Sequence, residues 1–304
     1  MTPVHLLWTE PFKNNHKKIE SCIHMFLSAT KIKEVYGGVH IITDRYGEYL
    51  VRNLGLPYDK VHLGLDQATP DFTFPDAKVI AYKLLSDAIP GYLYFDFDVF
   101  ITKPVPQKDI IVQCDEGATP YPYRIYKYLR DKGIEFCFDY ALKDLRFFNM
   151  GLFRCLDKSI IYEYYESYFT TKYKNQYVKL DDVLIPQYVM FLEQTYIYKV
   201  LQKNGLLDQV YEHYPRHINQ FNDVELHIEL DKANAIMDAY HNTDLDFEGY
   251  YHSPSDINNI EKTGYTHLMY FKIEDKVLED VAEYAFKNYP KKFAKLMVNM
   301  KCLC

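Results

Sequence analysis

The chain has 304 residues and a formal net charge of −7, with 35 Lys and Arg against 42 Asp and Glu. Its composition, 48% hydrophobic and 25% charged, excludes wholesale disorder and is ordinary for a globular protein that buries one large core. The acidic balance argues against a general nucleic-acid binder, because that class needs a basic excess to neutralise phosphates.

Apolar periodicity predicts strands that alternate with helices through the first hundred residues. In chain order, the predicted strands are Val4–Trp8, Val39–Thr43, Val61–Leu63, Tyr92–Ile101, Ile110–Cys114, Phe147–Cys155 and Tyr265–Phe271. The predicted helices are Lys17–Thr30, Gly47–Leu54, Ala77–Ile89, Ser159–Lys172, Val183–Gly205 and Val277–Met300, with a break near Pro290. Residues 115–146, rich in tyrosine, are predicted to be an irregular loop. The alternation indicates an α/β fold with a mostly parallel sheet, which binds ligands at the carboxyl ends of its strands.

The sharpest feature is a pair of acids in the most apolar predicted strand. Within Tyr92–Ile101, the residues other than Asp96 and Asp98 are apolar or aromatic. Strand side chains alternate between faces, so both carboxylates are expected on the same side, where they would repel each other and be costly to desolvate. A divalent cation, Mn²⁺ or Mg²⁺, would remove both penalties. The alternative is a strand end whose acids cap a helix or pair with Lys or Arg.

This stretch resembles the glycosyltransferases of the GT-A fold, and among them the glycogenin-like and capsular-polysaccharide types. Their signature is an apolar strand that runs into Asp-x-Asp, then a short apolar run and a proline, here Pro104. Ile41–Asp44 resembles their second strand, whose end flanks the nucleotide, and Phe148–Phe153 resembles their Phe-Asn-x-Gly strand beside the donor sugar. His267–Lys272 resembles their late His…Lys segment. The pieces follow the order of the family over residues 4–272.

The resemblance implies a single GT-A domain over residues 1–276. It implies a metal-dependent transferase that moves a sugar from a nucleotide-diphospho-sugar to a hydroxyl of a carbohydrate or lipid-linked acceptor, in bacterial polysaccharide or glycoconjugate synthesis. Asp96, Asp98 and His267 would hold Mn²⁺ or Mg²⁺, and Lys272 would meet the diphosphate.

Other polar residues are candidates for contact with the donor. The full set is Thr9, Thr43, Asp44, Lys78, Lys83, Asn149, Gly151 and Lys272. In similar enzymes a basic residue on the helix before Asp-x-Asp reaches the nucleotide; here Lys78 is slightly favoured over Lys83, and a solvated helix face is the alternative. Asn149 is a candidate partner for a sugar hydroxyl, and Gly151 would let the sugar approach the backbone.

Three acids, Asp181, Asp182 and Glu193, are candidate catalytic carboxylates, because transfer to a hydroxyl needs a base or a group near the anomeric carbon. Similar enzymes carry an acid-Gln pair at the start of a helix after the Asn-x-Gly strand, which Glu193 and Gln194 would match. The alternative for each acid is a helix cap or a surface group.

Two other functions compete with the transferase. Phosphatases and phosphotransferases of the haloacid-dehalogenase type also place Asp-x-Asp after an apolar strand, which would make Asp96 a nucleophile; their motif normally opens the fold, whereas here several elements precede it. The other is a non-catalytic sugar- or nucleotide-binding protein on the same scaffold.

The two ends of the sequence give separate expectations. The first residues lack the basic-then-apolar pattern of a signal peptide, and no apolar run reaches membrane-spanning length, so we expect a cytoplasmic protein. Residues 277–304 carry lysines between apolar residues and are predicted to form a basic amphipathic helical segment. It would either lie peripherally on the inner face of a membrane or dock on the sheet with its lysines in solvent.

Overall fold

The computed structural model describes residues 1–10, 21–68, 72–115, 120–140, 145–180, 184–213, 257, 260–268 and 275–303. The chain divides into two compact units. The first is made of Met1–Gln107 and Gly249–Cys304, and the second is Lys108–Glu248.

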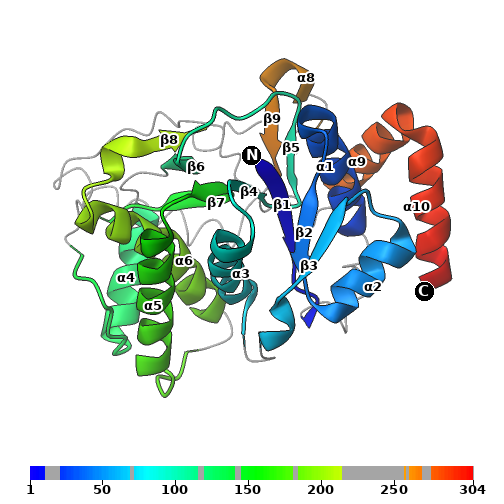
Figure 1. Cartoon of the computed structure of the whole chain (residues 1–304). Coiled ribbons are helices and arrows are strands. Elements are labelled where there is room, and N and C mark those ends of the chain that lie inside the picture. Colours follow the sequence, from blue (N-terminus) through cyan, green and yellow to red (C-terminus); the bar gives the residue numbers. More distant parts are fainter. Residues whose placement is uncertain are drawn as a thin grey trace. The chain divides into compact units, whose positions relative to one another are not determined.

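The first unit is built on a parallel sheet. Its strands are β1 (Thr2–Leu7), β2 (His40–Thr43), β3 (Lys60–Leu63) and β4 (Tyr92–Phe95), in the order β3-β2-β1-β4. Every neighbouring pair among these four is parallel. The helices between them are α1 (Ser21–Tyr36), α2 (Arg45–Leu54) and α3 (Phe74–Ala88) (Figure 1). β1 and β4 are nearly continuous apolar runs because they are buried along their length.

Local signals fix where two of these helices begin and end. The Asp44 side chain caps the start of α2, and Gly55 ends that helix in the left-handed conformation at φ 66°. At the start of α3, Thr73 and Asp76 form a capping box, with a proline in the first turn. The predicted helices at Gly47–Leu54 and Ala77–Ile89 are therefore confirmed, with earlier starts.

The predicted strand Tyr92–Ile101 is wrong as a single element. β4 ends at Phe95, and a separate strand, β5 (Val99–Ile101), begins after a turn that contains both acids. The turn is closed by the Val99 amide, which donates to the Asp96 carbonyl at 3.0 Å. β4 stays in the parallel sheet, whereas β5 pairs antiparallel with β9 (Tyr265–His267). The change of direction could not be recognised from the sequence, because both strands are buried and the apolar pattern continues through them.

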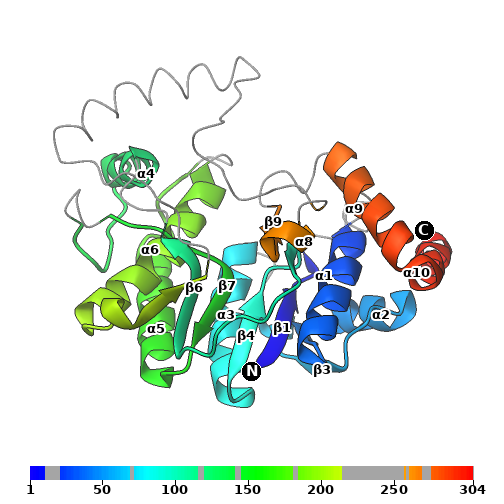
Figure 2. The ribbon, with the colours of Figure 1, turned by 90° about the horizontal axis from the view of Figure 1, so that it is seen from above.

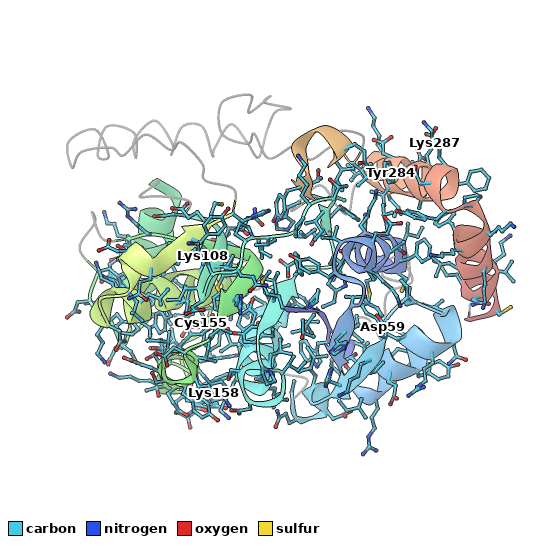
Figure 3. The ribbon with its side chains drawn as sticks, turned by 45° about the horizontal axis from the view of Figure 1, so that its top comes forward. Asp59, Lys108, Cys155, Lys158, Tyr284 and Lys287 are labelled. Carbon is cyan, nitrogen blue, oxygen red and sulfur yellow. The ribbon has the colours of Figure 1, made fainter. Side chains whose placement is uncertain are left out.

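The C-terminal helices pack within the first unit, against its N-terminal part. They are α8 (Ile260–Thr263), α9 (Asp275–Asn288) and α10 (Pro290–Leu303), so the predicted break near Pro290 is confirmed. Figure 2 shows α9 beside α1 and α10 beside α2, contacts that the structure also records. Val281, Phe293 and Leu296 enter the same core as Phe26 and Phe100. In Figure 3, Tyr284 lies on the side of α9 towards α1, whereas Lys287 points away from it.

This packing places the apolar side of the segment against protein. The lysines of α10 are solvent-exposed, as in the docked arrangement that the sequence left open. Among the described residues, no helix combines the length and hydropathy that crossing a membrane requires.

The second unit combines three described strands with helices. Its strands are β6 (Ile110–Asp115), β7 (Phe148–Cys155) and β8 (Val210–Glu212), in the order β7-β6-β8. β6 is antiparallel to β7 and parallel to β8. Its helices are α4 (Pro120–Asp131), α5 (Lys158–Lys174) and α6 (Leu184–Lys203). Parallel pairing thus dominates in the described strands, and the predicted α/β class with a mostly parallel sheet and flanking helices is confirmed.

The predicted irregular loop at 115–146 is wrong in part, because it contains α4. The helix is held by aromatic packing: the Tyr126 ring lies 5.1 to 6.1 Å, between centroids, from those of Phe136, Tyr140 and Phe191. Ile125 and Leu129, which lie one turn apart on α4, are also buried. Within the described part of this stretch, Tyr126 and Tyr140 therefore contribute to the packing of the unit.

Gly47→Ala tests the close approach of α2 to the end of β2. A Cβ at this position would lie 1.9 Å from Thr43 Oγ1, so a buried hydroxyl must move. We expect the free energy of unfolding to fall by about 1–3 kcal/mol, the usual cost of overpacking, measured by urea denaturation. The matched control is Gly38→Ala, where the Cβ would meet only the Asp59 carboxylate, at 3.2 Å. Equal stability of Gly47→Ala and wild type would contradict this packing.

Candidate metal centre

The candidate metal ligands lie at the carboxyl end of β4. Asp96 and Asp98 occupy the turn between β4 and β5, so it is this turn, and not the alternation of a strand, that places them together. Asp98 is fully buried, and the Asp96 side chain is 14% exposed. His267, the last residue of β9, lies opposite Val99 in the β5–β9 pair, and the Leu268 amide donates to the Asp98 carbonyl at 3.2 Å.

The three side chains form a compact group. His267 Nε2 lies 3.5 Å from Asp98 Oδ1 and 4.0 Å from Asp96 Oδ2. One ligand atom from each residue lies within 4.8 Å of the ligand atoms of the other two. Among the described residues, this is the group of side chains that could hold a metal ion. Two carboxylates and an imidazole, nearly all out of solvent, are a donor set that suits Mn²⁺ and also Mg²⁺. The residues present therefore fit the predicted metal.

A lysine and a tyrosine complete the surroundings of Asp96. Lys78 Nζ lies 3.4 Å from the Asp96 carboxylate, and the Tyr94 hydroxyl donates to Asp96 Oδ1. The same ammonium lies 5.5 Å from the centre of the Tyr94 ring. The pairing with Lys that the sequence offered as an alternative thus exists for Asp96, together with the three-ligand group. Lys83, the other candidate on α3, is instead 3.9 Å from Asp87 one turn away.

The candidate contacts at the ends of β1 and β2 bind one another. The Thr9 amide and hydroxyl both donate to the Asp44 carboxylate at 2.7–2.8 Å, and the Gly47 amide donates to it at 2.7 Å. Thr43 Oγ1 donates to the Leu7 carbonyl at 2.6 Å. All three side chains are buried. They join the ends of two strands to the start of α2, and contact with a nucleotide stays a prediction for them.

Three further candidates lie in the second unit. Asn149 and Gly151 are in β7, where Asn149 Oδ1 accepts a hydrogen bond from the Gly151 amide at 3.0 Å. Glu193 is 3% exposed in the middle of α6. The predicted helix Val183–Gly205 is confirmed as α6, so Glu193 and Gln194 lie inside a helix and not at its start, unlike the acid-Gln pair of similar enzymes. Asp181, Asp182 and Lys272 lie outside the described residues.

Sequence reasoning missed His5, which lies in β1 opposite Phe95 of β4. It is fully buried; burial lowers its pKa to about 3, although the charges of Asp96 and Asp98 act in the opposite direction. The imidazole is therefore neutral at physiological pH. In the sequence, His5 stands out only as a single histidine in an apolar strand. No other residue lies at a spacing from it that would indicate a shared role.

Fold and site together define an α/β protein with a candidate acidic metal centre at the carboxyl end of a parallel strand. The chain belongs to the DUF6734 family, a family of unknown function whose model matches residues 1–241. A comparison with curated proteins finds no match.

Several solved structures are similar to this chain. Mouse xyloside xylosyltransferase 1, in its apo form, is 9% identical, with 69% of this chain and 84% of that chain covered and a TM-score of 0.34. The glycosyltransferase GlyE of Streptococcus pneumoniae TIGR4 is 11% identical with a TM-score of 0.42; 98% of this chain is covered, and it spans 63% of the GlyE chain. An active-site mutant of LgtC is 12% identical, with 94% and 96% covered and a TM-score of 0.43. All three TM-scores are below 0.5, so the functional argument rests on the side chains of the site and not on these structures.

Asp98→Asn tests metal binding without reference to activity. The change keeps the shape of the side chain and removes one of the two negative charges. We expect Mn²⁺ to stabilise the wild type by about 2.7 kcal/mol at a concentration one hundred times its Kd, and to leave the Asp98→Asn variant unchanged. In EDTA the variant should be no less stable than the wild type, since the charge repulsion is gone. The measurement is thermal unfolding with Mn²⁺ and with EDTA.

The control is Asp87→Asn, which removes a carboxylate from the surface pair with Lys83. This variant should respond to Mn²⁺ like the wild type. A wild type whose unfolding is indifferent to Mn²⁺ and Mg²⁺ would show that the three side chains do not form a metal site.

Proposed function

We propose that the protein is a metal-dependent glycosyltransferase that moves a sugar from a nucleotide-diphospho-sugar to a hydroxyl of a carbohydrate or lipid-linked acceptor. The observation that carries the proposal is the grouping of Asp96, Asp98 and His267 at the end of β4, with Lys78 beside them. A role in bacterial polysaccharide or glycoconjugate synthesis is part of the proposal and follows from the sequence resemblance. A location in the cytoplasm or at the inner face of the membrane is a further part of the proposal and rests on the sequence pattern alone.

The chemistry follows from the charge that develops on the leaving group. A nucleoside diphosphate gains negative charge as the glycosidic bond breaks, and a divalent cation bound by Asp96, Asp98 and His267 would supply the compensating charge. Lys78 holds the Asp96 carboxylate from the side of α3 and adds a positive charge within 3.4 Å. Lys272 is proposed, by resemblance alone, as a second cation on the diphosphate.

The remaining roles are assigned by the same resemblance. Asn149 and Gly151 would face the donor sugar, and Asp181 and Asp182 are the proposed carboxylates for acceptor activation. Glu193 is the weaker candidate for that role, because it is buried in the middle of a helix. Thr9, Thr43 and Asp44 would shape the nucleotide side through the bonds that join their strand ends.

His267 favours the transferase over a phosphatase with Asp96 as nucleophile. The transferase resemblance placed a histidine from a late segment on the Asp-x-Asp pair, and the structure has its imidazole 3.5 Å from Asp98. The Asp96 carboxylate also accepts from the Tyr94 hydroxyl and pairs with Lys78, as expected for a carboxylate that is held in place. A non-catalytic binding protein would have the same site, so a measurement of turnover is needed to distinguish it from an enzyme.

Metal-dependent nucleotide binding is the direct test. We expect calorimetry with a panel of nucleoside diphosphates and their sugars to give binding in Mn²⁺ and none in EDTA. Lys78→Met should weaken binding roughly tenfold or more, the worth of a hydrogen bond to a charged group. Lys83→Met, on the same helix, is the matched control and should bind like the wild type, because Lys83 is paired with Asp87.

The outcomes separate the three functions. Release of the nucleoside diphosphate from one nucleotide-sugar, with transfer of the sugar to an acceptor or slowly to water, supports a transferase. Binding without any turnover across acceptors indicates a binding protein. If no nucleotide binds and phosphate becomes covalently attached to Asp96, the phosphatase reading replaces the proposal.

A further inference from the structure

The first residue of β5 connects all three candidate ligands. Val99 follows Asp98 in the chain, its amide donates to the Asp96 carbonyl at 3.0 Å, and it lies opposite His267 in the β5–β9 pair. A shift of Val99 would therefore change the spacing of both carboxylates and of the imidazole together. Whatever holds this residue sets the geometry of the centre.

The carbonyl of Val99 points away from β9. The Leu268 amide donates to the Asp98 carbonyl, and the Thr102 amide donates to the Gly264 carbonyl, so the ladder bonds fall on alternate positions that exclude Val99. In such a non-hydrogen-bonded pair, the N–H and C=O groups face outwards. A buried carbonyl of this kind needs a donor from another element. Ser28 of α1 supplies it, because its hydroxyl donates to the Val99 carbonyl.

The direction of this bond determines the bonds behind it. A carbonyl accepts only, so the Ser28 proton is committed to Val99, and Ser28 Oγ accepts from His5 Nε2 at 3.1 Å. His5 Nδ1 then carries no proton and accepts from the Tyr58 hydroxyl at 2.7 Å. Both His5 and Ser28 are fully buried, and burial keeps the imidazole neutral. The commitment of the Ser28 proton to the Val99 carbonyl fixes the tautomer of His5. The result is a one-way chain of donors from Tyr58 through His5 and Ser28 to Val99.

We propose that Ser28 and His5 are positioning residues of the metal centre, which fix the Asp96–Asp98 turn and His267 by holding the Val99 carbonyl. The inference rests on the proposed function only in taking these three side chains as metal ligands. The residues of this hydrogen-bond chain come from β1, α1 and the loop before β3, all of which are far from Val99 in sequence. Neither residue is one of the three candidate ligands, and both would act through the backbone between those ligands.

The test measures Mn²⁺ affinity directly, by electron paramagnetic resonance of free Mn²⁺ with the full chain. Loss of a group that orients metal ligands typically weakens binding roughly 10–100-fold, and we expect Ser28→Ala to fall in that range. The matched control is Thr30→Val. Thr30 is buried on the same helix, but its hydroxyl donates to the Phe26 carbonyl within α1, at 2.7 Å. This variant should lose stability to a similar extent and keep the affinity of the wild type.

His5 provides the second pair of variants, which decides the matter if Ser28→Ala fails to fold. His5→Gln keeps an N–H donor for Ser28 and should retain most of the affinity, whereas His5→Phe fills the space without a donor and should lose it. A role in stability alone would lower the midpoint of unfolding in both and leave Mn²⁺ affinity equal.

Failure of the inference and failure of the proposed function look different. If the wild type binds Mn²⁺ and Ser28→Ala and His5→Phe bind it equally well, the positioning role is overturned and the transferase proposal stands. If the wild type binds no Mn²⁺, with or without a nucleoside diphosphate, the proposed function and this inference both fall.

Discussion

Two neighbouring carboxylates at the end of β4, one of them fully buried, are the constraint on which the packing around the centre depends. Asp98 is fully out of solvent, and charged groups in such a place are stable only with strong compensation. Asp96 has the Lys78 ammonium and the Tyr94 hydroxyl, and the His267 imidazole lies 3.5 Å from Asp98. Among the described residues, the Lys78 ammonium pairs with Asp96, and a divalent cation would offset the charge of the two acids together.

The third ligand comes from the far end of the chain, so the centre depends on the docking of the C-terminal segment. Lys31 of α1 pairs with Glu261 of α8 at 2.9 Å, and the Tyr284 hydroxyl of α9 donates to the same carboxylate. Burial alone would lower the pKa of Lys31, but its bonds with Tyr284 and Glu261 raise that pKa above its ordinary value. The lysine therefore stays charged and holds α8 and α9 on α1. Since β9 follows α8 directly, this cluster supports the approach of His267 to the two acids.

The sequence predicted most elements because periodicity and caps are local, and it failed where the deciding contact is distant. Tyr92–Ile101 was predicted as one strand because an apolar run looks the same whether or not it turns, and only pairing with β9 makes β5 separate. The pairing of Asp96 with Asp98 was predicted from the alternation of a strand, although a turn brings it about, and His267 was added from the family order. The start of α6 was predicted within one residue, but Glu193 lies in the middle of that helix and so does not match the acid-Gln pair that begins a helix in similar enzymes. His5 was missed because its meaning depends on Ser28 and Tyr58, which no pattern along the chain connects to it.

The same apolar residues that concealed the turn also explain why it is stable. Phe97, between the two acids, is buried in the core that contains Phe100 and Leu268, so the turn is anchored by an aromatic side chain on one side. On the other side, the backbone is held through the Val99 carbonyl by Ser28. Apolar burial fixes where the turn lies, and a directional hydrogen bond fixes how it is oriented. A metal site needs both, because two carboxylates that merely lie close together repel each other, and only a fixed orientation aims their oxygens at one ion.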